Sequence, residues 1–140
     1  MRAGWTAEAT RFLALRLRPG DDLRGGLDAA FRAEGLASGF VVSLIGSLSV
    51  ATVRPAGSDT PLVVDIPTEI VSLSGTFAAE GCHLHMSVAD ARGRMTGGHV
   101  LAGCRVRTTV EAVLALTDAA GFRRRRDPET GYAELTFDER

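Results

Sequence analysis

The stretch CHLHMSVADARGRMTGGH, residues 82–99, decides the centre of the fold because it is typical of two strands joined by a tight turn. Apolar and polar residues alternate over residues 82–89, which is the period of a strand with one buried face. Residues 90–93, Asp-Ala-Arg-Gly, favour a turn, since Asp90 can bond to the backbone and Gly93 can adopt a positive φ. The stretch therefore predicts a β-hairpin.

The three histidines of the 140-residue chain all lie in this hairpin. His83 and His85 are two residues apart, so a strand carries both side chains on the same face. His99 falls on the second strand. The meeting of the three imidazoles depends on how the two strands are paired.

The turn sets this pairing. If Ala89 and Arg94 close the hairpin, residues whose numbers sum to 183 face each other, and position 98 lies opposite His85. A one-residue bulge at Gly97 and Gly98 would bring His99 there instead. We therefore expect three imidazoles to converge on one face, with a bulge in the second strand.

Three imidazole nitrogens with a fourth position left open are the ligand set of many catalytic zinc sites. The spacing predicts a site for zinc or another divalent metal on His83, His85 and His99. A second interpretation stays open, in which these histidines make ordinary hydrogen bonds on a polar sheet face or at a subunit boundary. Gly97 and Gly98 can equally serve only a bend or a close approach of two backbones.

Working outward toward the N-terminus, RFLALRL at residues 11–17 alternates like a half-buried strand, and Pro19-Gly20 ends it. Asp21 or Asp22 is a suitable cap for a following helix that Gly35 closes. The apolar face of this helix comprises Leu23, Leu27, Ala30 and Phe31. Trp5, ahead of the strand, is expected to pack.

The remaining segments predict strands. Residues 39–55 suggest two strands broken near Gly46, and residues 55–61 form a polar loop. A strand that begins at residue 62 is interrupted at Pro67 and resumes beyond it. Apolar and polar residues alternate again over residues 104–116, which predicts a further strand. Residues 122–137 suggest two short strands around a turn at 127–131. We expect one α+β domain over residues 1–140, its core at about 10–138, with a mostly antiparallel sheet and one main helix packed on it.

Composition narrows the function classes. The formal net charge is −1, whereas dedicated nucleic-acid binders usually have a strongly basic domain. The most basic run, Arg123 to Arg126, is followed by Asp127 and Glu129, which favours a solvated edge with ion pairs over a DNA-binding stripe. We find no pattern of a signal peptide or a membrane span in the sequence. Cys82 and Cys104 are expected to pack as small apolar residues in a reducing compartment. We therefore expect a cytoplasmic protein.

Five segments, in this order, resemble one known family. They are LRPGDDLRGGL (17–27), VVSLIGSLSVATVR (41–54), TEIVSLSGTF (68–77), HLHMSVADARGRMTGGHVLAGCRV (83–106) and FRRRRDPETGYAEL (122–135). Together they resemble the plant- and prokaryote-conserved (PPC) domain, whose bacterial members are described as PD1-like DNA-binding proteins. The resemblance implies an antiparallel sheet with a packed helix, assembled as a homotrimer.

The resemblance also bears on partners. Plant members carry AT-hook motifs that bind DNA, and their domain mediates self-association and contacts with transcription factors through a short segment that aligns with residues 66–71. Only Glu69 and Ile70 match that segment, so they are the candidates for contact with a protein partner. The Arg-Gly-Arg-Pro core of an AT-hook does not occur in these 140 residues, so we expect DNA association to be weak or indirect.

In prokaryotic members, histidines that match His83, His85 and His99 are suited to a metal near a subunit boundary. The residues around them that also match are Asp90, Gly93, Gly97 and Gly98. We assign these four to the turn and to the shape of the pocket.

Three functions remain open. The first is a trimeric PPC-like binding or regulatory module with a three-histidine metal site. The second is a small zinc-dependent hydrolase or lyase, for which Asp90, Glu69 and Glu111 are the candidate general bases. The third is a small-ligand binder with its site between protomers.

Overall fold

A computed structural model describes residues 9–118 and 121–138, so the expected packing of Trp5 lies outside the described residues. The elements follow in the order β1 (Arg11–Leu17), α1 (Leu23–Ala33), β2 (Ser38–Arg54), β3 (Leu62–Val64), β4 (Thr68–Ala78), β5 (Gly81–Ala89), β6 (Met95–Val100), β7 (Arg105–Thr117), β8 (Phe122–Arg126) and β9 (Ala133–Phe137). The expected class, a mostly antiparallel sheet with one main helix, is confirmed for the described residues. The helix found there is too short to cross a membrane.

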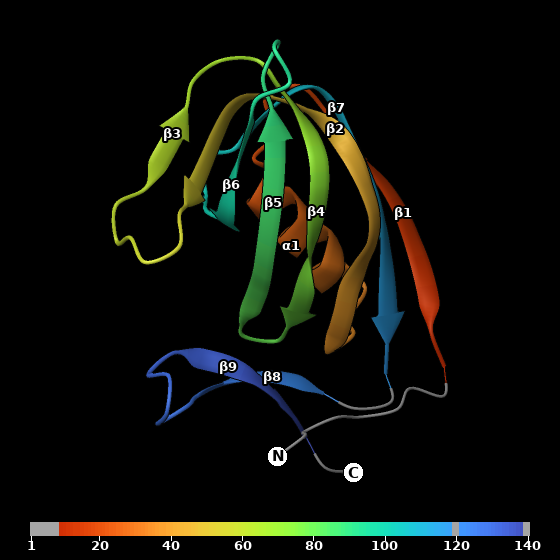
Figure 1. The fold of residues 1–140 in the computed structure, drawn as a ribbon. Coiled ribbons are helices and arrows are strands. Elements are labelled where there is room, and N and C mark those ends of the chain that lie inside the picture. The colour runs from red at the N-terminus through yellow and green to blue at the C-terminus, as the bar shows by residue number, and fades with distance from the viewer. Residues whose placement is uncertain (1–8, 119–120, 139–140) are drawn as a thin grey trace.

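The large sheet has the strand order β1-β7-β2-β4-β5-β6, and β3 pairs with β2. The long strand β2 uses its first part to pair with β4 and its last residues to pair with β6, so the β2-β4-β5-β6 part of the sheet curls round on itself. All of these pairings are antiparallel. Figure 1 shows the curled sheet with α1 behind it and the small β8-β9 hairpin below.

The expected break near Gly46 is wrong, because β2 runs through it as one strand. The pairing of β2 with β7 shifts register between Gly46 and Leu48 instead. A side chain at position 46 would collide with the carbonyl oxygen of Thr109, so glycine lets two strands pass closely while β2 bends. Strand β2 therefore bends at Gly46 instead of ending there.

Helix α1 begins where the sequence indicates. Asp22 is the N-cap, and its Oδ1 accepts a hydrogen bond of 2.8 Å from the Gly25 N–H, while its Oδ2 accepts one of 2.6 Å from the Gly103 N–H. The helix packs on the sheet through Leu23, Leu27 and Phe31, which are fully or almost fully buried.

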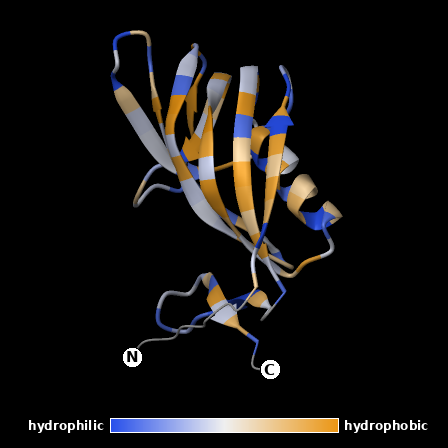
Figure 2. Cartoon of the chain, turned by 90° about the vertical axis from the view of Figure 1, so that its right-hand side faces the viewer, coloured by the Kyte–Doolittle hydropathy of each residue, from blue (hydrophilic) through white to orange (hydrophobic). Residues whose placement is uncertain are grey.

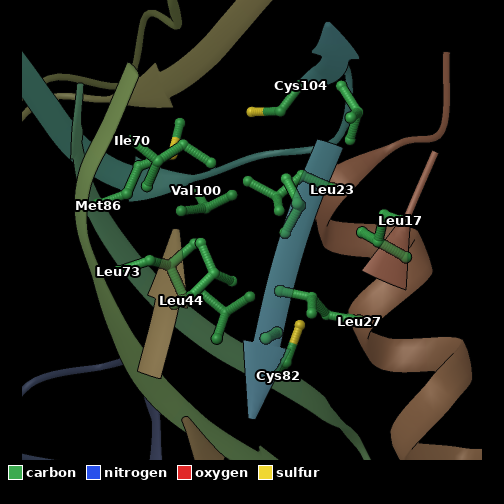
Figure 3. Packing of buried hydrophobic residues seen from close by; sticks show 14 of the residues in the cluster. Leu17, Leu23, Leu27, Leu44, Ile70, Leu73, Cys82, Met86, Val100 and Cys104 are labelled. Carbon is green, nitrogen blue, oxygen red and sulfur yellow. The ribbon is translucent and has the colours of Figure 1, made fainter. Parts of the chain in front are cut away.

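The buried side chains of the helix and of the curled sheet meet in one core. Figure 3 shows Leu23 and Leu27 of α1 facing Leu44, Leu73 and other residues of the strands. Both cysteines are free and buried in this core, as expected. Figure 2 shows hydrophobic residues recurring along the strands and hydrophilic ones in several loops.

The hairpin of β5 and β6 differs from the expected one by a single residue. The Asp90 N–H donates to the Arg94 carbonyl, and the Gly93 N–H donates to the Asp90 carbonyl, so Asp90 takes the place of Ala89 as the partner of Arg94. Paired residues then sum to 184, as in Ala89 with Met95, and the expected bulge at 97–98 is absent. The register of the turn alone places His99 opposite His85.

Candidate metal centre

The three histidines converge on one face of the β5-β6 hairpin. The Nε2 atoms of His83 and His85 are 3.0 Å apart, and one ligand nitrogen from each of the three rings lies within 4.8 Å of the others. The ring centroids are 4.8, 5.0 and 5.5 Å apart. In the part of the chain that the structure describes, this is the only cluster of three or more possible ligands that could share a metal ion.

The sheet register explains which neighbours the histidines have. On one side Thr76 of β4 pairs with His83, and on the other Arg54 of β2 pairs with His99. Because directly paired residues point to the same face, Thr76 and Arg54 lie beside the imidazoles. The residues of β5 that alternate with the histidines, Leu84 among them, are buried in the core on the opposite face.

The glycines beside the histidines serve close approach of backbones. A Cβ at Gly97 would lie 2.5 Å from the Met86 carbonyl oxygen, and one at Gly98 would lie 2.5 Å from the Arg54 carbonyl oxygen. Glycine therefore allows β6 to fit between β5 and the end of β2. The two residues hold His99 in place through backbone spacing.

A cavity of about 730 Å³ lies over the histidines. Besides the imidazoles, its charged lining residues are Arg24 of α1, Arg54 of β2, Arg124 of β8, and the acids Glu80 and Glu134. Tyr132, in the turn between β8 and β9, lines it too. The C-terminal hairpin thus provides part of the cavity wall.

The arginine run of β8 divides between two faces. Arg123 and Arg125 pair with Asp138 at 2.6 and 3.0 Å, so this part is an ion-paired edge, although the partner is Asp138 instead of Asp127 or Glu129. The expectation of a solvated edge is wrong for Arg124. Alternation along the strand turns Arg124 the other way, into the cavity, where it is half-buried and donates to the Thr76 hydroxyl.

The environment keeps the imidazoles of His83 and His99 neutral. Burial, followed by the electrostatic effects of His83 and Arg54, lowers the pKa of His99 to about 4. Burial, followed by the charge of Arg124, also lowers the pKa of His83. A neutral imidazole has a free lone pair, so His83 and His99 are in the form that binds a metal at neutral pH.

The low pKa of His99 predicts a pH dependence of the metal-free protein. The unfolded chain protonates His99 near pH 6.5 and the folded chain near pH 4, so between these values only the unfolded chain binds the proton. Stability is therefore expected to fall as the pH is lowered through this window. Urea unfolding in EDTA at pH 7.0, 5.5 and 4.5 should show a steeper loss for the wild type than for His99→Gln, and equal losses would contradict the assignment.

The histidines fit a zinc ion. Two nitrogens bound to one tetrahedral zinc are about 3.4 Å apart, so separations within 4.8 Å require only small side-chain movements. The Nδ1 atom of His99 is buried and has no hydrogen-bond partner among the described residues, as expected of a site that binds something further. Imidazole ligands suit zinc and its neighbours in the first transition series.

The structure places Asp90, Gly93, Glu69 and Ile70 outside the cavity that contains the imidazoles. The Asp90 carboxylate is used within the turn, where Oδ1 accepts from the N–H groups of Arg92 and Arg94, and Gly93 there has φ +73°. Asp90 and Glu69 line a separate small cavity. Ile70 is buried in the core, which leaves Glu69 as the exposed member of that pair.

Sequence reasoning missed the charged residues of the cavity. None of the three candidate bases, Glu69, Asp90 and Glu111, lines it, and the acids that do are Glu80 and Glu134. The position of Glu80, three residues before His83, could have suggested it. No local signal points to Glu134, because the β8-β9 hairpin reaches the site only through the tertiary fold. Cys104 is not a ligand, since its Sγ contacts the backbone of Thr52.

Comparison with known proteins places this site in a family. A model of the Plants and Prokaryotes Conserved (PCC) domain matches residues 6–118. The chain belongs to this family. The finding confirms the resemblance seen in the sequence, and the matched part of the PCC domain includes all three histidines.

Similar structures agree on the fold of this PCC chain. A hypothetical protein from Salmonella enterica is 37% identical, has a TM-score of 0.92, and matches over 96% of this chain and 98% of its own. A metal-containing protein from Archaeoglobus fulgidus is 22% identical with a TM-score of 0.83, over 96% and 99% of the two chains. A "Putative DNA-binding protein" from Ralstonia eutropha is 26% identical with a TM-score of 0.72, over 91% and 90%.

A curated relative is a much longer protein. The "Bifunctional protein GlmU" of Synechococcus sp. (strain JA-3-3Ab) is 46% identical over 125 residues, which is 89% of this PCC chain and 20% of the relative. The chain therefore spans about a fifth of the length of that protein.

Proposed function

We propose that this PCC chain is a binding or regulatory module that holds a divalent metal, best zinc, on His83, His85 and His99. The observation that carries the proposal is the convergence of three imidazole nitrogens within 4.8 Å at the floor of a cavity. A bound zinc ion would supply a Lewis-acidic centre with a position open to a ligand. The similar Archaeoglobus protein, described as metal-containing, supports the proposal through a shared fold.

The test of the metal site is a zinc titration of the EDTA-treated protein by isothermal titration calorimetry, with elemental analysis of the protein as purified. We expect saturation at one ion per chain. Anomalous diffraction at the zinc edge would give the position of the ion, which we expect between the three imidazole rings. Absence of saturable binding by zinc, nickel and cobalt would overturn the proposal.

We further propose the homotrimer that the family resemblance implies. Large apolar side chains are exposed on the sheet, among them Phe12 (68% exposed), Ile45 (59%) and Val71 (54%). Phe12 and Phe40 both pair with Ala115, so they lie in one row across β1, β7 and β2. Exposed apolar surface of this kind favours association with further copies of the chain. Light scattering after gel filtration tests this assembly, and a monomer at micromolar concentration would exclude it.

Contact with DNA, in this proposal, is weak or indirect. Two similar proteins are named as a "putative" DNA-binding protein, but the formal net charge here is −1, and Arg123 and Arg125 are paired with Asp138. A gel-shift at two salt concentrations tests this, since phosphate contacts weaken as salt rises. The two free, buried cysteines are consistent with a reducing compartment, and we propose a cytoplasmic location.

A zinc-dependent hydrolase or lyase is the second candidate, because Glu80 and Glu134 line the same cavity as the histidines. Each of these carboxylates is a candidate general base for such an enzyme. Zinc-dependent turnover of model esters and phosphoesters that is lost in Glu134→Gln or Glu80→Gln, with zinc still bound, would favour this candidate over the binding module.

A further inference from the structure

Three arginines from separate elements reach the cavity above the histidines. Arg24 of α1 donates to the Cys82 carbonyl at 3.0 Å, Arg54 of β2 is paired with His99, and Arg124 of β8 donates to the Thr76 hydroxyl. Each is therefore positioned by a contact or a strand pairing next to the hairpin that carries the histidines. Their convergence is a product of the fold, since they lie 30 and 70 residues apart along the chain.

These three guanidinium groups line the cavity, and none of them has a carboxylate within 4.0 Å among the described residues. Across residues 9–118 and 121–138, ion pairs within 4.0 Å involve Arg32, Arg94, Arg123 and Arg125, and none involves Arg24, Arg54 or Arg124. In addition, the Nε of Arg124 is buried and finds no hydrogen-bond partner among the described residues. A half-buried cation with an unused donor is costly unless a ligand satisfies it.

The two acids of the cavity act on the Arg124 guanidinium only from beyond ion-pair distance, because their close contacts are to other groups. Glu80 lies 3.9 Å from Arg123 and accepts from the backbone N–H of Arg124, and Glu134 accepts from the Thr130 hydroxyl at 2.9 Å. Three arginines against two carboxylates leave the lining positive, even without a metal. The lining is thus complementary to an anion.

We propose that this cavity binds a small organic anion, whose phosphate or carboxylate group contacts Arg24, Arg54 and Arg124 and whose oxygen reaches the metal. Planar guanidinium groups bind these two oxyanions through paired hydrogen bonds. A volume of about 730 Å³ suits a metabolite-sized ligand. DNA phosphates would instead require arginines on an open surface, whereas Arg124 lies half-buried within the cavity.

The anion part of this inference rests on the proposed metal site only for the final contact, so it is tested first without metal. Binding of inorganic phosphate, glycerol 3-phosphate and malonate to EDTA-treated protein is measured by calorimetry at low salt, with glycerol as the neutral control. We expect saturable binding of at least one oxyanion, none of glycerol, and tighter binding after zinc loading. Phosphate probes and malonate distinguish the two anion classes.

Variants locate the binding. Arg124→Ala and Arg54→Ala are each expected to weaken oxyanion binding by about 10-fold or more, while Arg126→Ala, an exposed residue of the same strand, leaves it unchanged. Equal affinity in all three variants would overturn the inference, as would the absence of binding by every probe. So would a duplex DNA that displaces the probe from the same arginines. If zinc fails to bind while the oxyanions still do, the metal proposal and the contact with the metal are excluded, and the binding of the anion by the arginines stands.

Discussion

Replacing His99 by alanine is expected to lower the zinc affinity of the chain by at least about 100-fold. Loss of a partner outside the ligand shell already costs 10–100-fold in metal affinity, and His99 would be one of three protein ligands. His83→Ala should have an effect of the same size. Competition with a chromophoric chelator measures both dissociation constants. The zinc content measured by elemental analysis after gel filtration should fall from one ion per chain to almost none.

The fold should survive these substitutions, since the histidines lie on the face opposite the core. Circular dichroism and the urea midpoint in EDTA check this. Cys104→Ala is the matched control, because a thiol is the other common zinc ligand and this one is bonded to the Thr52 backbone. Unchanged zinc content in both histidine variants, or its loss in Cys104→Ala, would contradict the site.

Gly75→Ala is expected to destabilise the protein by about 3 kcal/mol or more, at the upper end of what overpacking costs. Gly75 lies on β4 opposite Leu84, and a Cβ there would collide with the carbonyl oxygen of His83. The obstacle is backbone, so no rotation of a side chain relieves it. Urea unfolding in EDTA measures the loss, and the folded fraction should also bind zinc more weakly because β5 is displaced at His83.

Ser74→Ala provides the comparison for Gly75→Ala. Serine already carries a Cβ at the neighbouring, exposed position of β4, so this change adds no atom to the sheet. Its free energy of unfolding should stay within about 0.5 kcal/mol of the wild type. A loss below about 1 kcal/mol in Gly75→Ala would contradict the close approach of the β4 and β5 backbones at Gly75.

The elements that depend on local signals were predictable from the sequence. Asp22 caps α1, and the alternation over residues 11–17 and 82–89 gives β1 and β5, because capping and side-chain period act over a few residues. The shared face of His83 and His85 follows directly from that period. Family resemblance then added the order of the segments.

Details that depend on spacing between strands were not predictable in the same way. Whether Asp90 or Ala89 is the partner of Arg94 decides whether His99 faces His85 directly, and no composition rule fixes the length of such a turn. Gly46 suggested a break because glycine weakens isolated strands, but the neighbouring Thr109 carbonyl makes it a point of close packing. The roles of Arg124 and Glu134 depend on contacts between segments about 40 to 50 residues apart.

The histidines and part of the cavity wall come from different regions of the chain, because the β8-β9 hairpin follows the region that carries the histidines. The match to the PCC domain ends at residue 118 and contains the three imidazoles, whereas Arg124, Tyr132 and Glu134 follow it. Figure 1 shows this hairpin as an appendage beneath the sheet. Changes in the sequence or length of these last residues would therefore alter which ligands the cavity binds, while the three histidines keep their positions. If the proposed anion site is correct, the β8-β9 hairpin is the part of the chain in which sequence changes would alter ligand choice without moving the three histidines.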